Sequence, residues 1–163
     1  MPKRILPGDT LVVFTIDDKL FALPLEQVIR VERSVKITTV HDAPSHLFGV
    51  IDNHGAILPV IDIRRLTGMP LRQVTIDDQM IMVQCHYYTV VIIVDKVVSV
   101  VKAENVISAE KLMGKELSMP QVMSTPNGIV LVLDAEQLLN FNATLELREA
   151  VEHLNDSEVA SLA

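Results

Sequence analysis

The side chains that most often carry out catalysis or bind metals are few in this sequence, and their spacing suits neither role. Zinc sites use histidine and cysteine at short, fixed spacings along the chain. No such spacing occurs among the five histidines, which are His41, His46, His54, His86 and His153. Cys85 and His86 are neighbours in a predicted strand, so they point to opposite faces, and a buried cysteine packs as a small hydrophobe. The sequence therefore predicts no metal site and no cysteine nucleophile.

Motifs for a nucleophilic serine and for phosphate binding are also missing from the sequence. There is no Gly-x-Ser-x-Gly elbow, and the six glycines are scattered along the chain rather than gathered in one loop. Adjacent carboxylates occur at Asp17-Asp18 and Asp77-Asp78, where they favour turns for backbone reasons. We therefore expect a protein that is not an enzyme and that needs no cofactor.

The composition favours an acidic β-sheet protein. Of the 163 residues, 49% are hydrophobic and only 4% aromatic, so the apolar mass is mainly aliphatic, and its β-branched members favour strands. A net charge of −7 argues against a nucleic-acid partner, because phosphate binding needs a basic surface. The single cysteine fits a reducing compartment, and the longest apolar run, 90–101, is too short to span a bilayer. No signal peptide is visible, so we expect a cytoplasmic protein without membrane insertion.

The first third of the chain is predicted to form three strands after a loose leader at 1–9. The strands are expected at 10–16 (TLVVFTI), 19–24 (KLFALP) and 28–33 (VIRVER), with one helical turn at 25–27. A basic cluster in and after the third strand is unusual on an acidic chain, and it consists of Arg30, Arg33 and Lys36. This cluster is either a partner surface or a solvated strand face.

The segment 48–68 (FGVIDNHGAILPVIDIRRLTG) organises the rest of the chain. Two short apolar runs flank Asn53-His54-Gly55, a tripeptide that predicts the turn of a β-hairpin. The second run ends at Asp62, a favourable N-cap for a short helix that ends at Gly68. Pro59 lacks a backbone N–H, so it predicts that the second strand lies at an edge or a bulge.

The second half of the chain repeats the apolar pattern of the first half. Residues 10–16 and 21–32 lie over 79–85 and 90–101 at an offset of 69, and residues 56–66 lie over 128–138 at an offset of 72. We therefore predict an internal duplication. It gives two β units, at about 10–74 and 75–141, each with about five strands that close a small barrel and can be exchanged between units. Asp134 takes the place of Asp62 and predicts a second short helix at 135–139.

The last segment, 142–163, changes character. Leu147, Val151 and Leu154 recur at helical spacing, whereas acidic residues occupy the other faces. This pattern predicts an acidic C-terminal helix that docks weakly on a barrel. A solvated helix without a partner role is the alternative.

Segment 48–68 resembles the signature of the CheW-like domain family of bacterial chemotaxis adaptors. The matching residues are Gly49, Gly55, Pro59, Val60, Asp62 and Arg64. His54 stands where the family has Arg, and Asp52 stands where it usually has Asn. The similarity extends over about 9–140 and includes Ala43-Pro44 and the stretch from Val94 to Val100.

The resemblance implies an all-β fold of two SH3-like five-stranded barrels with short helices. It also implies a non-enzymatic adaptor that couples the cytoplasmic hairpin tip of methyl-accepting chemoreceptors to the regulatory domain of a CheA-type histidine kinase. Such a protein is cytoplasmic and is associated with membrane-bound receptor arrays. The alternative is a stand-alone CheW-like regulatory module that binds a single partner in another two-component or pili-type chemosensory pathway.

By position, the resemblance assigns Val28, Gly49, His54 and Val97 to the receptor groove, either lining or supporting it. It assigns a structural role in the signature turn to Gly55, Pro59, Asp62 and Arg64. For Val28 and Val97, core packing is an equally good interpretation of the sequence. Arg30 stands where the family commonly has Glu.

Overall fold

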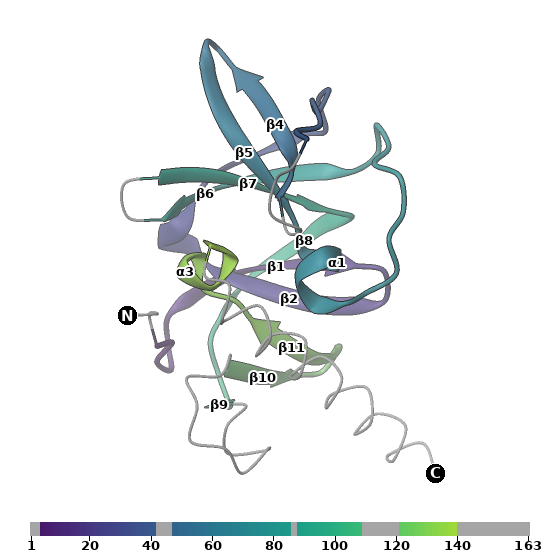
Figure 1. The fold of residues 1–163 in the computed structure, drawn as a ribbon. Helices are drawn as coiled ribbons and strands as arrows, with labels where there is room; N and C mark the ends of the chain where they lie inside the picture. Colours follow the sequence, from purple (N-terminus) through teal and green to yellow (C-terminus); the bar gives the residue numbers. More distant parts are fainter. Residues whose placement is uncertain (1–3, 42–46, 86–87, 109–120, 140–163) are drawn as a thin grey trace.

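Two β-sheets account for most of the residues that the structure describes, and the helices are short (Figure 1). The structure is a computed structural model, and it describes residues 4–41, 47–85, 88–108 and 121–139. The mostly-β fold predicted from the sequence is confirmed. The predicted C-terminal helix at 142–163 lies outside the described residues, as do Ala43-Pro44, His46, His86 and His153.

The larger sheet, sheet A, has the strand order β8-β1-β2-β11-β10-β9. Its strands are β1 (Thr10–Ile16), β2 (Lys19–Pro24), β8 (Lys96–Lys102), β9 (Val106–Ser108), β10 (Gln121–Thr125) and β11 (Gly128–Val132). The smaller sheet, sheet B, has the order β3-β6-β7-β5-β4. Its strands are β3 (Val28–Arg33), β4 (Leu47–Asn53), β5 (Ala56–Asp62), β6 (Gln79–Cys85) and β7 (Tyr88–Val94). The short helices are η1 (Leu25–Gln27), α1 (Ile63–Thr67) and α3 (Ala135–Leu139).

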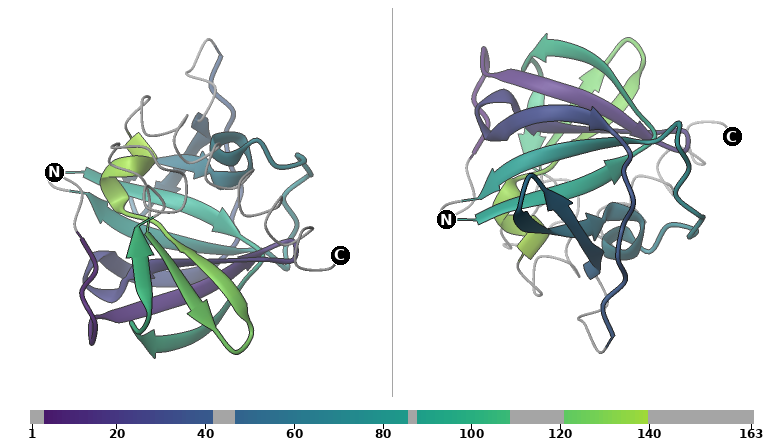
Figure 2. Two further views of the ribbon diagram at one scale, coloured as in Figure 1. Left: turned by 90° about the horizontal axis from the view of Figure 1, so that it is seen from below. Right: turned by 90° about the horizontal axis from the view of Figure 1, so that it is seen from above.

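Each sheet contains strands from both halves of the chain. In sheet A the hairpin β1–β2 pairs with β8 on one side and, in parallel, with β11 on the other. In sheet B the hairpin β6–β7 pairs with β3 and, in parallel, with β5 in the same way. The remaining hairpins, β4–β5 and β10–β11, consequently stand at opposite ends of the molecule, at the top and bottom of Figure 1 and facing the viewer from above and below in Figure 2.

The buried apolar residues form three clusters, and the central strands are buried on both faces. The central core lies between the sheets and takes Phe14 and Leu131 from sheet A and Ile92 from sheet B. An outer cluster covers the other face of sheet A, and a second outer cluster covers the other face of sheet B. Strands buried on both faces need continuous apolar runs rather than alternation, which explains sequences such as VVIIV.

A bulge in β8 changes which face its side chains occupy. Its register with β1 skips Val98, because Val13 pairs with Ser99 and the next residue, Phe14, pairs with Val97. Val97 packs against the central core, whereas Val101 packs against the outer cluster of sheet A. Strict alternation would place both valines on one face of the sheet, and the extra residue allows the change.

The N-terminal segment is not the loose leader that the sequence predicted. Ile5 is buried in the outer cluster of sheet A. Its backbone N–H donates to Gln121 Oε1 (2.6 Å), and Gln121 Nε2 donates to its carbonyl oxygen (3.0 Å). The Gly8 N–H also donates to the carbonyl oxygen of Ala103 (2.9 Å). These partners lie far along the chain, so local sequence carried no signal for the contact.

Candidate interaction surface

The β4–β5 hairpin has the tight turn that Asn53-His54-Gly55 predicted. His54 and Gly55 both have positive φ, 53° and 92°, as a two-residue type I′ turn requires. The side chain of Asp52 accepts a hydrogen bond from the Gly55 N–H (2.8 Å) and stabilises the turn. The side chain of His54 is exposed at the tip. The turn thus presents His54 at one end of the molecule.

Pro59 lies in the part of β5 that pairs with β4 but not with β7. The cross-strand partner of Pro59 is Val50, whose backbone N–H and carbonyl oxygen both bond to Thr38 (2.9 Å each). These two backbone groups of Val50 therefore point away from β5. By the alternation of an antiparallel ladder, Pro59 faces away from β4, toward the side on which pairing with β7 begins only at Val60. The missing N–H consequently removes no ladder hydrogen bond, although β5 lies between β7 and β4 and is not the edge strand that the sequence predicted.

Gly49 is buried beneath the segment that follows β3. A Cβ atom at Gly49 would lie 2.4 Å from the Thr38 carbonyl oxygen and 2.7 Å from Ile37 Cγ2. Both distances are shorter than any normal contact, so only glycine fits at this position. Gly49 supports the hairpin base from inside and does not line an open surface.

The end of the signature segment is a capped, buried helix start. The side chain of Asp62 accepts a hydrogen bond from the Arg64 N–H (3.0 Å), and Gly68 ends α1 with a left-handed φ of 70°. Both caps were predicted from the sequence. Burial raises the pKa of the Asp62 carboxyl above its usual value, despite this backbone hydrogen bond and the nearby arginines.

Arg64 is the centre of a network of charges that joins three segments of the chain. Its side chain is only 7% exposed. Nη1 and Nη2 donate to the two carboxylate oxygens of Asp17 (2.7 and 2.8 Å), in the turn between β1 and β2. Nη2 also donates to Asp95 Oδ1 (3.1 Å), between β7 and β8, and Nη1 donates to the Pro70 carbonyl oxygen (3.1 Å). The bidentate bond from Arg64 lowers the pKa of Asp17.

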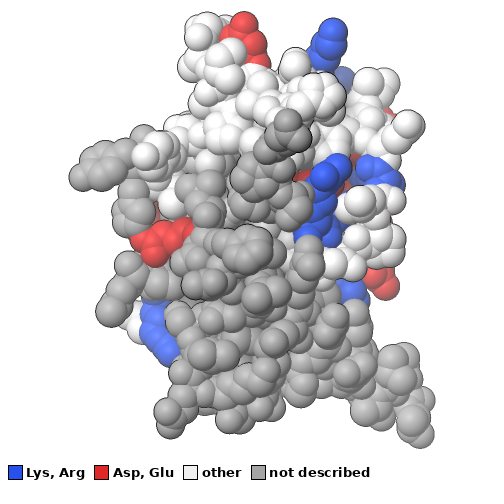
Figure 3. Space-filling model, in the orientation of Figure 1, with Lys and Arg blue, Asp and Glu red and all other residues white. Residues whose placement is uncertain are grey.

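Arg72 extends this arginine network through the connection between α1 and β6. It donates from both nitrogens to the carboxylate of Asp78 (2.9 and 2.6 Å), which is buried, and it also donates to Asp95. The hydrogen bond from Arg72 is the main reason that the pKa of Asp78 is lowered. Figure 3 shows basic and acidic side chains adjoining one another at the right of this face, on the side where α1 lies in Figure 1. The network fixes the turns of both sheets at this end of the molecule.

The predicted groove residues Val28 and Val97 lie on edge strands. Val28 is the first residue of β3, and Val97 is the second residue of β8. Each is partly buried and packs against the central core. The Val97 N–H donates to Gln79 Oε1 (2.6 Å), which ties β8 to the first residue of β6. The structure therefore places these two valines on one apolar cluster, whereas Gly49 lies beneath 37–38 and His54 at the hairpin tip.

The three residues of the basic cluster do not act as one patch. Arg30 Nη2 donates to Asn53 Oδ1 (2.8 Å), and its Nε lies 2.8 Å from Glu32 Oε1. Arg33 is exposed on the same strand. Lys36 instead borders a shallow groove of about 460 Å³ between the segment after β3 and the segment before β6, with Phe48 and Val74 among its lining residues.

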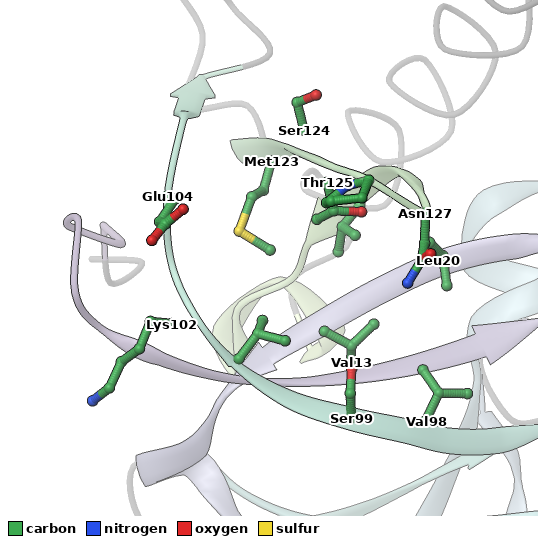
Figure 4. Close-up of a pocket in the computed structure, with 13 residues that line it drawn as sticks. Val13, Leu20, Val98, Ser99, Lys102, Glu104, Met123, Ser124, Thr125 and Asn127 are labelled. Atoms are coloured by element: carbon green, nitrogen blue, oxygen red, sulfur yellow. The ribbon is translucent and has the colours of Figure 1, made fainter.

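A second depression lies in sheet A between β8 and the β10–β11 hairpin, and no sequence pattern indicated it (Figure 4). This β10–β11 pocket has a volume of about 300 Å³. Its apolar lining includes Val13, Met123 and Val130, which also belong to the outer cluster of sheet A. Small side chains such as Ser99 leave the space open, and no local motif announces such a vacancy.

The described residues contain no group of three or more His, Cys, Asp or Glu side chains that could hold a metal ion. The buried Cys85 has a pKa raised by burial, which disfavours the reactive thiolate. In the part of the chain that the structure describes, none of the helices has the length and apolar character needed to cross a membrane.

Comparison with known proteins finds curated relatives that are named as chemotaxis proteins. The chain is 30% identical over 101 residues to the chemotaxis protein CheW of Bacillus subtilis and 29% identical over 90 residues to that of Rhizobium meliloti. These matches cover 62% and 55% of this chain, and they span only 65% and 58% of the relatives' own lengths.

A structural comparison and a family model give results consistent with these relatives. The crystal structure of the scaffolding protein TtCheW from Thermoanaerobacter tengcongensis superposes with a TM-score of 0.72 at 23% identity, covering 86% of this chain and 92% of that one. The model of the CheW-like domain matches residues 10–143. The chain therefore belongs to the CheW-like domain family.

Proposed function

We propose that this protein is a non-enzymatic adaptor that couples methyl-accepting chemoreceptors to a CheA-type histidine kinase in bacterial chemotaxis. The observation that carries the proposal is the family match over 10–143, together with curated relatives named for chemotaxis. The printed description of the related structure as a scaffolding protein supports the same role. On this proposal the protein works in the cytoplasm, at membrane-bound receptor arrays.

The surface that would serve this role is built from backbone edges and apolar side chains. β3 and β8 are edge strands, and they carry exposed apolar residues, Ile29 and Val31 on β3 and Val98 and Val100 on β8. Edge strands and exposed apolar groups are features of surfaces that bind other proteins. Val28, Gly49, His54 and Val97 would support or line the receptor groove.

We also infer that the two halves, about 10–74 and 75–141, are duplicated units whose sheets curl into SH3-like barrels. The matched strand orders support this inference, since β1–β2 with β8, β11 and β10 corresponds to β6–β7 with β3, β5 and β4. The caps support it as well, because the Asp134 side chain accepts from the Glu136 N–H (2.8 Å) as Asp62 accepts from Arg64.

The test of the adaptor role is co-purification with two partners at once. We expect the purified protein to form a ternary complex with a chemoreceptor hairpin fragment and a CheA-type kinase. Binding to only one of them would instead support the stand-alone regulatory module, and binding to neither would refute both. The adaptor alone should show no hydrolase or transferase activity.

The role of the hairpin tip is tested with a matched pair of variants. His54→Arg restores the residue that the family has at this turn, and Pro126→Arg adds the same charge at the turn of the opposite hairpin. A new hydrogen bond to a charged group is worth about 1.5–3 kcal/mol, so we expect His54→Arg to tighten partner binding about tenfold or more. An equal effect of Pro126→Arg would show that net charge, and not the tip, governs affinity.

A further inference from the structure

The outer part of the β4–β5 hairpin extends beyond the sheet that supports its base. β5 pairs with β7 only through Val60, Ile61 and Asp62, whereas its earlier residues pair with β4 alone. In Figure 1 the hairpin rises above β6 and β7. Ile57 is 64% exposed near the tip. A two-stranded projection of this kind is only marginally stable without additional contacts.

Arg30 makes such a contact from the opposite edge of the sheet. β3 and β4 are the two edge strands of sheet B, yet Arg30 Nη2 on β3 donates to Asn53 Oδ1 on β4 (2.8 Å). Asn53 is the residue immediately before the turn, next to His54. A hydrogen bond between these side chains therefore joins the two edges of the sheet at the tip of the projecting hairpin.

Two further groups hold the guanidinium in place for this contact. Arg30 lies opposite Met82 in the β3–β6 pair, and its Nε lies 3.2 Å from Met82 Sδ and 2.8 Å from Glu32 Oε1. The amide nitrogen of Asn53 is 4.0 Å from the same sulfur atom. Because the planar guanidinium is fixed by Glu32 and Met82, less side-chain entropy is lost when it bonds Asn53.

We propose that Arg30 is a positioning residue that latches the β4–β5 hairpin to β3 and so sets where His54 is presented. In this role Arg30 acts through Asn53 and need not touch a partner itself. The consequence for partner affinity rests on the proposed adaptor function, whereas the latch is a property of the free protein.

The latch is tested by amide hydrogen exchange on the free, full-length protein. Arg30→Met keeps the length and apolar contact of the side chain but removes its donors, and Arg33→Met on the same strand is the matched control. We expect exchange of the amides at 52–58 to become about three- to tenfold faster in Arg30→Met, the loss of one exposed hydrogen bond to a charged group. In Arg33→Met it should stay within about twofold of the parent.

Two additional variants separate a latch from a general loss of stability. Asn53→Ala should accelerate exchange at 52–58 as much as Arg30→Met, and the double variant should add nothing further, since both changes remove one interaction. Arg30→Lys retains the positive charge and a donor group at the end of the side chain, and it should restore part of the protection. Unchanged exchange in Arg30→Met, or additive effects of Arg30→Met and Asn53→Ala, would overturn the proposal.

Partner binding provides the second readout. With a chemoreceptor hairpin fragment or a CheA-type regulatory domain, Arg30→Met and Asn53→Ala should weaken affinity by the same factor. If exchange accelerates in both variants but only Arg30→Met weakens binding, Arg30 contacts the partner directly and the positioning role is wrong. If neither partner binds the parent protein, the adaptor function fails, and the exchange data still decide whether the latch exists.

Discussion

In each sheet a space lies between the projecting hairpin and the opposite edge strand, and we call this space the mouth of the sheet. The two mouths share a strand arrangement but differ in how side chains fill them. At the mouth of sheet B, Arg30 reaches Asn53 and Met82, and the three side chains occupy the space between β3, β4 and β6. At the mouth of sheet A, the corresponding space is the β10–β11 pocket of about 300 Å³. The residues at equivalent positions are Ser99 for Arg30, Thr125 for Asn53 and Val13 for Met82.

Side-chain length at three positions decides whether such a mouth is open or filled. Arg30 and Met82 are cross-strand partners, and so are Ser99 and Val13. The backbone places each pair in the same relation to its sheet, and the small pair in sheet A leaves a vacancy. Two sheets with matched strand orders can therefore offer different surfaces, because packing at the rim depends on individual residues and not on the strand order.

The bases of the two hairpins are anchored by different means as well. Gly49 in β4 allows the Thr38 backbone to approach and pair with Val50. Gln121 occupies the equivalent position in β10, and its side chain bonds the backbone of Ile5 on both sides. One hairpin is held by close backbone contact and the other by an amide side chain.

The largest effect on stability is expected at the two equivalent helices, α1 and α3, because they differ in charge at one position. Arg64 is the second residue of α1 and pairs with Asp17 and Asp95, whereas Glu136 is the second residue of α3. We expect Arg64→Met to lower the free energy of unfolding by about 3 kcal/mol, because it leaves two carboxylates without their buried partner. Glu136→Met should cost less than about 1 kcal/mol. Urea unfolding at pH 7 measures both, and equal losses would remove the distinction between the two ends.

The hairpin anchors should differ by a smaller amount. Gly49→Ala places a Cβ atom 2.4 Å from the Thr38 carbonyl oxygen, so the segment must move, at a cost of about 2 kcal/mol. Gln121→Ala removes two hydrogen bonds to Ile5 and should cost about 1 kcal/mol. Thermal unfolding of the two variants gives the order. A larger loss for Gln121→Ala would mean that the N-terminal segment is the more important anchor.

Acid should weaken the arginine network in a defined pH range. Arg72 and Arg64 lower the pKa of Asp78 and Asp17 below the ordinary value of 3.8. A lowered carboxyl pKa stabilises the fold fully above about 3.8, and this stability is lost as the pH falls through the folded-state pKa. Burial raises the pKa of Asp62, which acts in the opposite direction.

Arg72→Met tests this assignment, because it removes the cause of the Asp78 shift. Unfolding free energies measured from pH 6 down to pH 2.5 should fall less steeply below about pH 3.8 in this variant than in the parent protein. Arg33→Met, with an exposed arginine outside the network, should follow the parent curve. Parallel curves for the parent and Arg72→Met would show that the Arg72–Asp78 pair does not control acid stability.

The smallest effect comes from copying one mouth onto the other. Ser99→Arg with Thr125→Asn places the latch pair at the equivalent positions of sheet A. Both sites are at the surface, so we expect stability to change by less than about 0.5 kcal/mol. Exchange of the amides at 124–129 should slow about twofold, and only when both substitutions are present. Equal slowing by Ser99→Arg alone would indicate that the apolar stem fills the pocket without the hydrogen bond.

The local structure of the chain could be predicted from sequence. The strands at 10–16, 19–24 and 28–33 occur at the predicted bounds. The turn at His54-Gly55 and the caps at Asp62 and Gly68 also occur as predicted. These features depend on residues close in sequence: apolar runs, a turn that needs positive φ, and an N-cap that bonds a neighbouring amide. The signature within 48–68 also sufficed to predict the family, which the comparison confirmed.

The contacts between distant segments could not be predicted from sequence and became visible in the folded chain. The parallel pairs β5–β7 and β2–β11, the burial of Ile5 against Gln121, the arginine network and the Arg30–Asn53 contact all join residues that no local pattern connects. Each of these contacts forms only because the intervening chain folds so that the two residues come close together. A strand pattern specifies that a segment will be extended and which residues it can bury, but its neighbour in the sheet is selected by the fold as a whole.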